Sequence, residues 1–259
     1  MRILAVGDVC GDIGCNEVRD KLPKIKKDYN IDVVIINGEN SAQNNGITKE
    51  SAQYLLNIGA DVITGGNHSL RQASVYSFLD ETSVVLRPYN LPDCNIGRGY
   101  TLLDFGRYSI FVMNLIGTVY FDRIKVSNPF IAADELIDIA NGMGADYIFV
   151  DFHAEATSEK IALAKYLDGK VSAVFGTHTH VQTADNTILK SGTGYITDLG
   201  MTGPADSVLG VKNDIIINRF RNNDISKFEY ADGIGVFSGC IFEIENATGK
   251  TVTTQRIMI

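Results

Sequence analysis

The feature of this sequence that most limits its fold is an alternation of short apolar runs with helical segments near the N-terminus. Ile3–Val6, Val33–Ile36 and Asp61–Thr64 have the length and composition of buried strands. Between them, residues 14–28 place apolar side chains at helical spacing, and Thr48–Asn57 is predicted as a second helix. Because such strands are joined by helical crossovers, which are right-handed, the pattern predicts a parallel α/β sheet.

The rest of the chain adds a hairpin, a second strand–helix series and a strand-rich C-terminal part. Gly99–Phe105 and Tyr108–Leu115 are predicted to pair as a hairpin that turns at Gly106-Arg107. The further predicted elements are helices over 130–142 and 157–168 and strands over Tyr147–Val150, Val171–Phe175, Val236–Ile244 and Thr251–Met258. A parallel half and a more antiparallel half predict an α/β fold of two packed sheets with helices outside.

We expect one compact domain over residues 1–259, because the chain has no repeat or low-complexity linker and its 45% hydrophobic residues suffice for a substantial core. The net charge of −8 disfavours non-specific nucleic-acid binding. No apolar run is long enough to span a bilayer, and no signal peptide is recognisable, so we expect no membrane association. The cysteines lack C-x-x-C spacing, which indicates free thiols in a reducing cytoplasm; they are Cys10, Cys15, Cys94 and Cys240.

Polar side chains directly follow five of the predicted strands. In open α/β folds the carboxyl ends of the strands form the ligand crevice, so these side chains are expected to meet at one edge. All four histidines of the chain are among them. The candidate site residues are Asp8, Glu39, Asn40, Asn67, His68, His153, His178 and His180.

The mixture of imidazole nitrogens with carboxylate and amide oxygens indicates a metal site. In an extended segment, His178 and His180 would point to the same side and serve one metal pair. These ligands suit iron, manganese or zinc rather than a thiolate site, and Cys10 is interpreted as a small buried residue. Each residue alone has a plainer interpretation as a cap, a turn residue or a hydrogen-bonded histidine. Those interpretations do not explain why every histidine lies at an equivalent position.

Six stretches of the sequence match a known family. They are GDVCGDIG, INGENSAQNNGIT, DVITGGNH, VDFHAEATSEK, VFGTHTHVQTAD and YITDLGMTGPADSVLG. On these stretches the chain resembles the YmdB-like phosphodiesterases, a branch of the calcineurin-like metallophosphoesterases. GTHTHVQT and DFHAEATSEK are specific to this branch, whereas GNH is shared by the wider superfamily. The resemblance implies a metallophosphoesterase-type αββα sandwich of two mixed sheets flanked by helices.

The resemblance also implies a dinuclear metal centre, usually of iron, in which one residue bridges the two ions. One ion would be held by Asp8, Glu39, Asn40 and His180, and the second by Glu39, Asn67, His153 and His178, with Glu39 as the bridge. His68 would be the proton donor. Members of the family hydrolyse 2′,3′- and 3′,5′-cyclic nucleotides and tend to form oligomers, so we expect such substrates and a homo-oligomer. The chain departs from the family at Ser69-Leu70-Arg71, after GNH, and at Cys10.

These residue types suit phosphodiester hydrolysis by a hydroxide that bridges two divalent metal ions. The ions carry four positive charges, of which Asp8 and Glu39 remove two and the hydroxide one. The remaining positive charge matches a phosphodiester monoanion, so diesters are expected to be preferred over monoester dianions. Arg71 and Lys160 are the nearest cations along the sequence. His68 is expected to protonate the leaving alkoxide, the alternative being that it only orients the phosphate.

Three other functions stay open from the sequence. An amidohydrolase also uses H-x-H, but there the motif usually ends the first strand of a barrel, whereas here it follows the other ligands. A metal- and nucleotide-binding regulatory protein with little turnover would use the same residues. The third alternative is a phosphomonoesterase. Turnover of bis(p-nitrophenyl) phosphate with added metal would distinguish an active diesterase from these alternatives.

Overall fold

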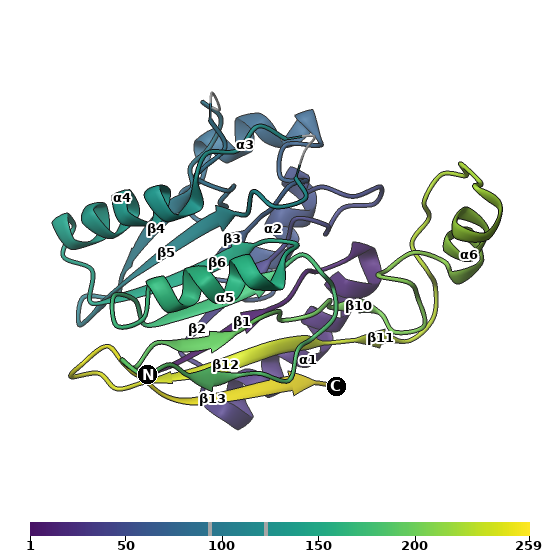
Figure 1. Cartoon of the computed structure of the whole chain (residues 1–259). Helices are drawn as coiled ribbons and strands as arrows, with labels where there is room; N and C mark the ends of the chain where they lie inside the picture. The colour runs from purple at the N-terminus through teal and green to yellow at the C-terminus, as the bar shows by residue number, and fades with distance from the viewer. Residues whose placement is uncertain (93–94, 122–123) are drawn as a thin grey trace.

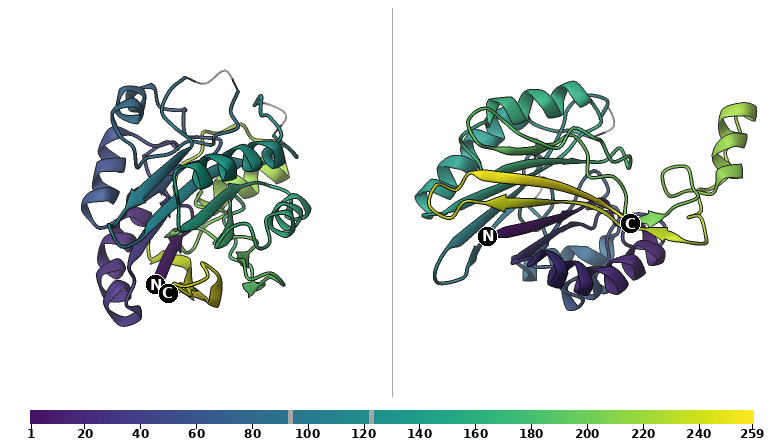
Figure 2. Two further views of the ribbon diagram at one scale, coloured as in Figure 1. Left: turned by 90° about the vertical axis from the view of Figure 1, so that its left-hand side faces the viewer. Right: turned by 90° about the horizontal axis from the view of Figure 1, so that it is seen from below.

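Two mixed β-sheets pack face to face, and helices cover their outer faces (Figures 1 and 2). These are the layers of the expected αββα sandwich. The computed structural model describes residues 1–92, 95–121 and 124–259, so Cys94 lies outside the described residues. Within those ranges, no helix has both the length and the apolar character that a membrane crossing requires.

The first sheet joins the two ends of the chain. Its strands, in spatial order, are β13 (Thr251–Met258), β12 (Ser238–Ile244), β1 (Arg2–Val6), β2 (Val33–Asn37) and β3 (Val62–Thr64). β1, β2 and β3 run parallel, whereas β12 lies antiparallel between β1 and β13. The outer face is covered by α1 (Gly11–Tyr29), α2 (Lys49–Asn57), the 3-10 turn η1 (Ala73–Val75) and α3 (Tyr76–Glu81).

The second sheet is built from the middle of the chain. Its strands, in spatial order, are β4 (Tyr100–Asp104), β5 (Ser109–Ile116), β6 (Tyr147–His153), β7 (Ala173–Thr177), β9 (Gly194–Ile196) and β8 (Thr187–Ile188). The predicted hairpin of β4 and β5 is confirmed, and β5, β6, β7 and β9 run parallel. The outer face is covered by α4 (Pro129–Gly142) and α5 (Thr157–Tyr166).

Apolar side chains from both sheets fill the space between them. Ile3 and Val33 of the first sheet share this core with Phe149 and Phe175 of the second. Successive residues of a strand point to opposite faces, so Leu4 and its neighbours on that face pack instead against the helices outside. The central strands are therefore buried on both sides, which explains why they are continuous apolar runs in the sequence.

Residues 203–236, which we call the arm, leave the sandwich and return to it. The arm begins and ends in a two-stranded sheet of β10 (Gly203–Pro204) and β11 (Gly235–Val236), and it carries α6 (Asn213–Asn222). Figure 1 and the right-hand view of Figure 2 show α6 standing apart from both large sheets. Consistent with this position, the Phe220 and Ile225 side chains are 82% and 91% exposed.

The observed elements differ from the predicted ones at a few boundaries. α1 begins at Gly11 rather than at 14, because its first buried residues are glycines that carry no apolar signal. β6 continues past Val150 to His153, since its polar residues are buried in the strand. The predicted strand Val236–Ile244 is interrupted at Phe237 and forms β11 and β12. The short elements α3, β8, β9 and β10 and the helix α6 were not predicted.

Candidate metal centre

The candidate site residues lie where strands of both sheets end. They follow β1 (Asp8), β2 (Glu39, Asn40), β3 (Asn67, His68) and β7 (His178, His180), and His153 is the last residue of β6. The expectation of one edge was wrong in one respect, because β1, β2 and β3 belong to one sheet and β6 and β7 to the other. The face-to-face packing of the sheets is what brings the two sets of strand ends together.

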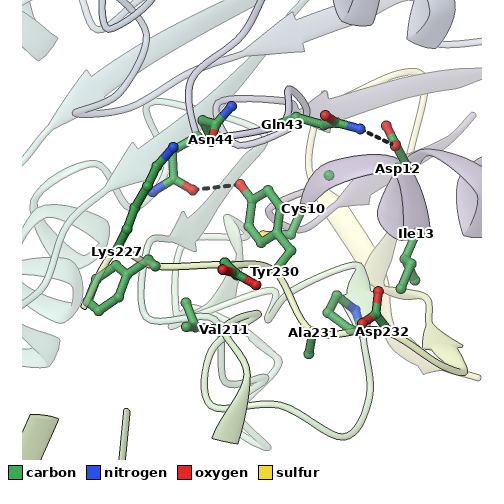
Figure 3. A pocket seen from close by; sticks show the side chains of 15 residues that line it. Cys10, Asp12, Ile13, Gln43, Asn44, Val211, Lys227, Tyr230, Ala231 and Asp232 are labelled. Carbon is green, nitrogen blue, oxygen red and sulfur yellow. Dashed lines mark hydrogen bonds between the residues drawn. The ribbon is translucent and has the colours of Figure 1, made fainter. Parts of the chain in front are cut away.

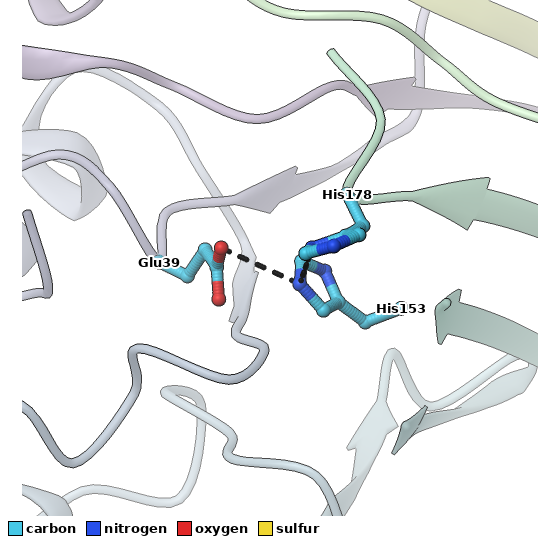
Figure 4. A group of neighbouring side chains, drawn as sticks. All are labelled: Glu39, His153 and His178. Carbon is cyan, nitrogen blue, oxygen red and sulfur yellow. Dashed lines mark hydrogen bonds and ion pairs between the residues drawn. The ribbon is translucent and has the colours of Figure 1, made fainter. Parts of the chain in front are cut away.

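Three side chains converge on Nε2 of His153, and Figure 4 shows two of them, Glu39 and His178. This nitrogen lies 2.9 Å from Asn67 Oδ1, 3.0 Å from His178 Nδ1 and 3.4 Å from Glu39 Oε1. The ligand atoms that Glu39, His153 and His178 offer all lie within 4.8 Å of one another. One cation could contact atoms at this spacing. Together with Asn67, these three residues are the four that were expected at the second metal ion.

A second group of side chains surrounds Nε2 of His180. This nitrogen lies 3.8 Å from Asp8 Oδ1 and 3.4 Å from Asn40 Nδ2. The Asn40 amide also donates to Glu39 Oε1 over 3.0 Å, the same oxygen that faces His153. Glu39 therefore lies between the two groups, which is the position that a bridging ligand requires.

Each histidine of the two groups has its other ring nitrogen occupied by an oxygen. His153 Nδ1 donates to Thr177 Oγ1 (2.9 Å), and His180 Nδ1 donates to the Leu209 carbonyl (3.1 Å). His178 Nε2 lies 3.0 Å from Glu155 Oε2. For each ring, these contacts favour the neutral tautomer whose site-facing nitrogen carries the lone pair that a metal ion binds. Burial also lowers the pKa of His153 well below its usual value, which keeps this ring neutral.

His178 and His180 lie in a turn rather than in the extended segment that was expected. β7 already ends at Thr177, and both histidines have left-handed backbone, with φ of 102° and 64°. The inference of a common side from strand alternation was therefore wrong, although both rings reach the site. Non-glycine residues adopt this conformation rarely, and such strain is most common where function depends on it.

A buried ion pair contacts the backbone of the turn that carries His178 and His180. Lys160 Nζ lies 2.6 Å from Asp198 Oδ2, and both side chains are almost completely buried. The same carboxylate oxygen accepts a hydrogen bond from the Thr179 amide (3.1 Å), between the two histidines. Lys160 is thus neutralised by Asp198, so it is not available as the free positive charge that its sequence position suggested.

Two local features favour a cation at this place. Asp8 Oδ1 is buried and has no hydrogen-bond partner among the described residues. Burial, together with repulsion by Asp198 and Glu39, raises the pKa of Asp8 well above its usual value, and a nearby positive charge would offset both effects. A Cβ atom at Gly66 would lie 2.2 Å from Glu39 Oε2 and 2.3 Å from His153 Nε2, so glycine keeps this space open. The residues present therefore fit a metal centre.

The sequence analysis missed the side chains that hold His153 in place. Thr177 Oγ1, which accepts from His153, donates to Asp151 Oδ1 over 2.7 Å. Asn37 and Thr64 also donate to the Asp151 carboxylate. Burial raises the pKa of Asp151 to about 6, although these hydrogen bonds oppose the shift. Because residues two apart in a strand face the same side, the VDFH stretch contained the signal that Asp151 lies beside His153.

His68 and Cys10 border the two groups. His68 is half-buried; its Nδ1 donates to Asn40 Oδ1 (2.9 Å), and its backbone amide donates to Glu39 Oε2 (3.1 Å). Cys10 Sγ lies 4.0 Å from His180 Nδ1, on the side of the ring that faces away from Asp8. Burial raises the pKa of the Cys10 thiol, which agrees with a small buried residue rather than a thiolate ligand.

The chain is similar to known proteins over its whole length. The sequence model of the family described as "YmdB-like protein" matches residues 4–257. The 2′,3′-cyclic-nucleotide 2′-phosphodiesterase of Bacillus subtilis is 46% identical over 100% of this chain and 97% of its own length. The crystal structure of a novel phosphatase from Mycoplasma pneumoniae is 35% identical, with a TM-score of 0.95 over 100% of this chain and 93% of that one.

A more distant likeness concerns the fold alone. The NAD nucleotidase of Haemophilus influenzae is 14% identical, with a TM-score of 0.63, and the match covers 100% of this chain and 55% of that one. The two-sheet architecture therefore recurs in a protein with little sequence similarity to this one.

Proposed function

The chain belongs to the YmdB-like protein family, and we propose that it is a metal-dependent phosphodiesterase that hydrolyses small phosphodiesters, with 2′,3′- and 3′,5′-cyclic nucleotides as its substrates. The observation that carries this proposal is the arrangement of His153, His178 and His180, each of which has one ring nitrogen held by an oxygen and the other turned toward side chains of the candidate site. The identity with a named 2′,3′-cyclic-nucleotide phosphodiesterase supports the same assignment.

We propose that the chain holds two divalent metal ions, with iron as the native metal and manganese or zinc as alternatives. Asp8, Asn40 and His180 would hold one ion, Asn67, His153 and His178 the other, and Glu39 both. When bound, such a pair of ions supplies an activated water molecule and neutralises negative charge on the phosphate. Imidazole, carboxylate and amide ligands without thiolate are the set that these metals share.

The chain's own residues then determine which phosphate esters are accepted. Asn40 and Asn67 are neutral where aspartates would add negative charge, so the centre favours a monoanionic diester over a dianionic monoester. His68, whose ring contacts Asn40, is placed at the border of the site to deliver a proton to the leaving oxygen.

The test of this function compares three substrates at one pH with one metal. We expect higher kcat/KM for bis(p-nitrophenyl) phosphate and 2′,3′-cyclic AMP than for p-nitrophenyl phosphate. A preference for the monoester would contradict the charge argument and indicate a phosphomonoesterase, which the phosphatase named among the similar structures makes the second candidate. A metal-loaded protein that turned over none of the three would instead be a binding or regulatory protein.

Metal analysis of protein purified without oxygen tests the cofactor. We expect about two metal ions per chain, predominantly iron. An anomalous-scattering map with a single site, or with none near Glu39, would contradict the dinuclear proposal.

We further propose that the chain acts in the cytoplasm as a homo-oligomer. The molar mass in solution would test the oligomeric state.

A further inference from the structure

A cavity of about 330 Å³ opens directly beside the candidate metal centre (Figure 3). Its lining comes from residues 10–13 after β1, residues 43–45 after β2, and the arm, which contributes residues 227–232 together with Pro204 and Val211. Two contacts connect it to the site, since Cys10 Sγ lies 4.0 Å from His180 and the Tyr230 hydroxyl donates to the Asn40 carbonyl over 3.0 Å. The cavity therefore borders residues that contact the candidate ligands His180 and Asn40.

Tyr230 fixes the wall of the cavity that the arm contributes. Its hydroxyl contacts Asn45 Oδ1 (2.7 Å) as well as the Asn40 carbonyl. Its ring lies so close to Gly11 that a Cβ there would come within 2.8 Å of Tyr230 Cδ2. The arm is thus attached to the loops that carry the candidate ligands, although α6 itself stands apart.

The lining of the cavity combines aromatic rings with side-chain amides. Phe228 and Tyr230 contribute aromatic rings, and Gln43, Asn44 and Asn45 contribute amide donors and acceptors on the opposite loop. The Arg219 guanidinium lies 4.0 Å from the centroid of the Phe228 ring and covers one of its faces. Proteins bind unpaired nucleobases with this combination, because rings stack on the base and amides pair with its edge. The volume lies within the range of small-molecule sites.

The charges of the lining favour a neutral group over a second phosphate. Asp12, Glu229 and Asp232 contribute three carboxylates, against the single ammonium group of Lys227. Lys212, outside the lining, lies 2.7 Å from Glu229 and 3.9 Å from Asp232, whereas Asp12 accepts a hydrogen bond from the neutral amide of Gln43 (2.8 Å). An anion would be repelled here, whereas an uncharged ring would not.

We propose that this cavity binds the nucleobase of a mononucleotide whose phosphodiester lies at the metal centre. The inference rests on the proposed function and adds where the rest of the substrate lies. The arm then determines substrate choice through Phe228 and Tyr230, while the strand ends supply the chemistry.

The experiment measures binding rather than turnover. Manganese-loaded protein is titrated by calorimetry with adenosine 3′-monophosphate and, separately, with inorganic phosphate. Phe228→Ala should weaken binding of the nucleotide by about 5- to 100-fold, the range that base–aromatic stacking contributes, and leave phosphate binding unchanged. Gln43→Ala, on the opposite wall, should also weaken binding of the nucleotide and leave phosphate binding unchanged. The control is Phe220→Ala, since Phe220 lies on α6 and does not line the cavity.

Comparing adenosine 3′-monophosphate with inorganic phosphate distinguishes a failure of the base-site proposal from a failure of the proposed function. Equal affinity of adenosine 3′-monophosphate for wild type, Phe228→Ala and Gln43→Ala would overturn the base site while leaving the phosphoesterase proposal intact. A parallel loss of phosphate binding would show that the variants damage the metal centre, and it would also count against a separate base site. A wild type that binds the nucleotide through this cavity but hydrolyses no diester would instead contradict the proposed function.

Discussion

His68 is the one histidine that the resemblance does not assign as a metal ligand, and its ring contacts the candidate ligand Asn40. We predict that His68→Ala keeps both metal ions and loses most diesterase turnover, because a positioned general acid contributes about 10²- to 10⁴-fold. Metal content and kcat for bis(p-nitrophenyl) phosphate are measured on the same preparation. If metal and activity fell together, His68 would be a ligand and its proposed role as proton donor would be wrong.

Thr177 relays a hydrogen bond from His153 to the buried carboxylate of Asp151. Thr177→Val keeps the shape of the side chain but removes this relay, so His153 loses the contact that orients its ring. We predict a loss of about 10- to 100-fold in metal affinity, the usual effect of removing such a partner. Thr177→Ser retains the hydroxyl and is the matched control. Equal manganese affinity of the valine and serine variants, measured by competition with a chelator, would contradict this role.

At the scale of the elements, the turn after β7 depends on the ion pair between α5 and the segment after β9. Lys160→Met would leave Asp198 charged, buried and without its cation. Removing one partner of such a pair costs about 3–5 kcal/mol, so the free energy of unfolding in guanidinium should fall by that amount. Lys165→Met, on the exposed side of the same helix, is the control. An equally small effect of both substitutions would mean that the pair contributes little to stability.

The buried strands and the strand-end residues could be predicted from the sequence, because strand length and burial leave a direct apolar signal. That β1–β3 share one sheet with β12 and β13 could not be predicted, since the pairing of Ile3 with Phe242 joins residues far apart along the chain. The conformation of His178 and His180 also escaped prediction, because left-handed backbone at a histidine is held by tertiary contacts such as that of Thr179 with Asp198.

The arm was missed for a different reason. Its helix α6 buries only Ile216, although Ile217 and Phe220 are also apolar, so its position apart from the core could not be inferred from the sequence. Its contribution to the cavity comes from Phe228 and Tyr230, which follow the helix in an irregular segment. Irregular segments leave no periodic signal, so this wall of the cavity became visible only in the structure.

At the scale of the whole molecule, neither half of the sequence contains all the strands of either large sheet. In the first sheet, for example, β1 pairs with β2 from the N-terminal half and with β12 from the C-terminal half. We therefore predict that the chain unfolds as one cooperative domain, with far- and near-ultraviolet circular dichroism changing at the same guanidinium concentration. Manganese at about 100 times its dissociation constant should stabilise the folded state by about 2.7 kcal/mol. Two separate transitions would show that the sheets unfold independently.

The position of β1 at the centre of the first sheet also has a consequence for synthesis. β1 leaves the ribosome long before β12, its neighbour on one side, which begins only at Ser238. At about 5–20 residues per second, the nascent chain carries an unpaired apolar strand edge for roughly ten to fifty seconds. Such an edge is a template for pairing with other chains. Ribosomes stalled before Ser238 should therefore display a nascent chain that chaperones retain, and completion of the last two strands should release it.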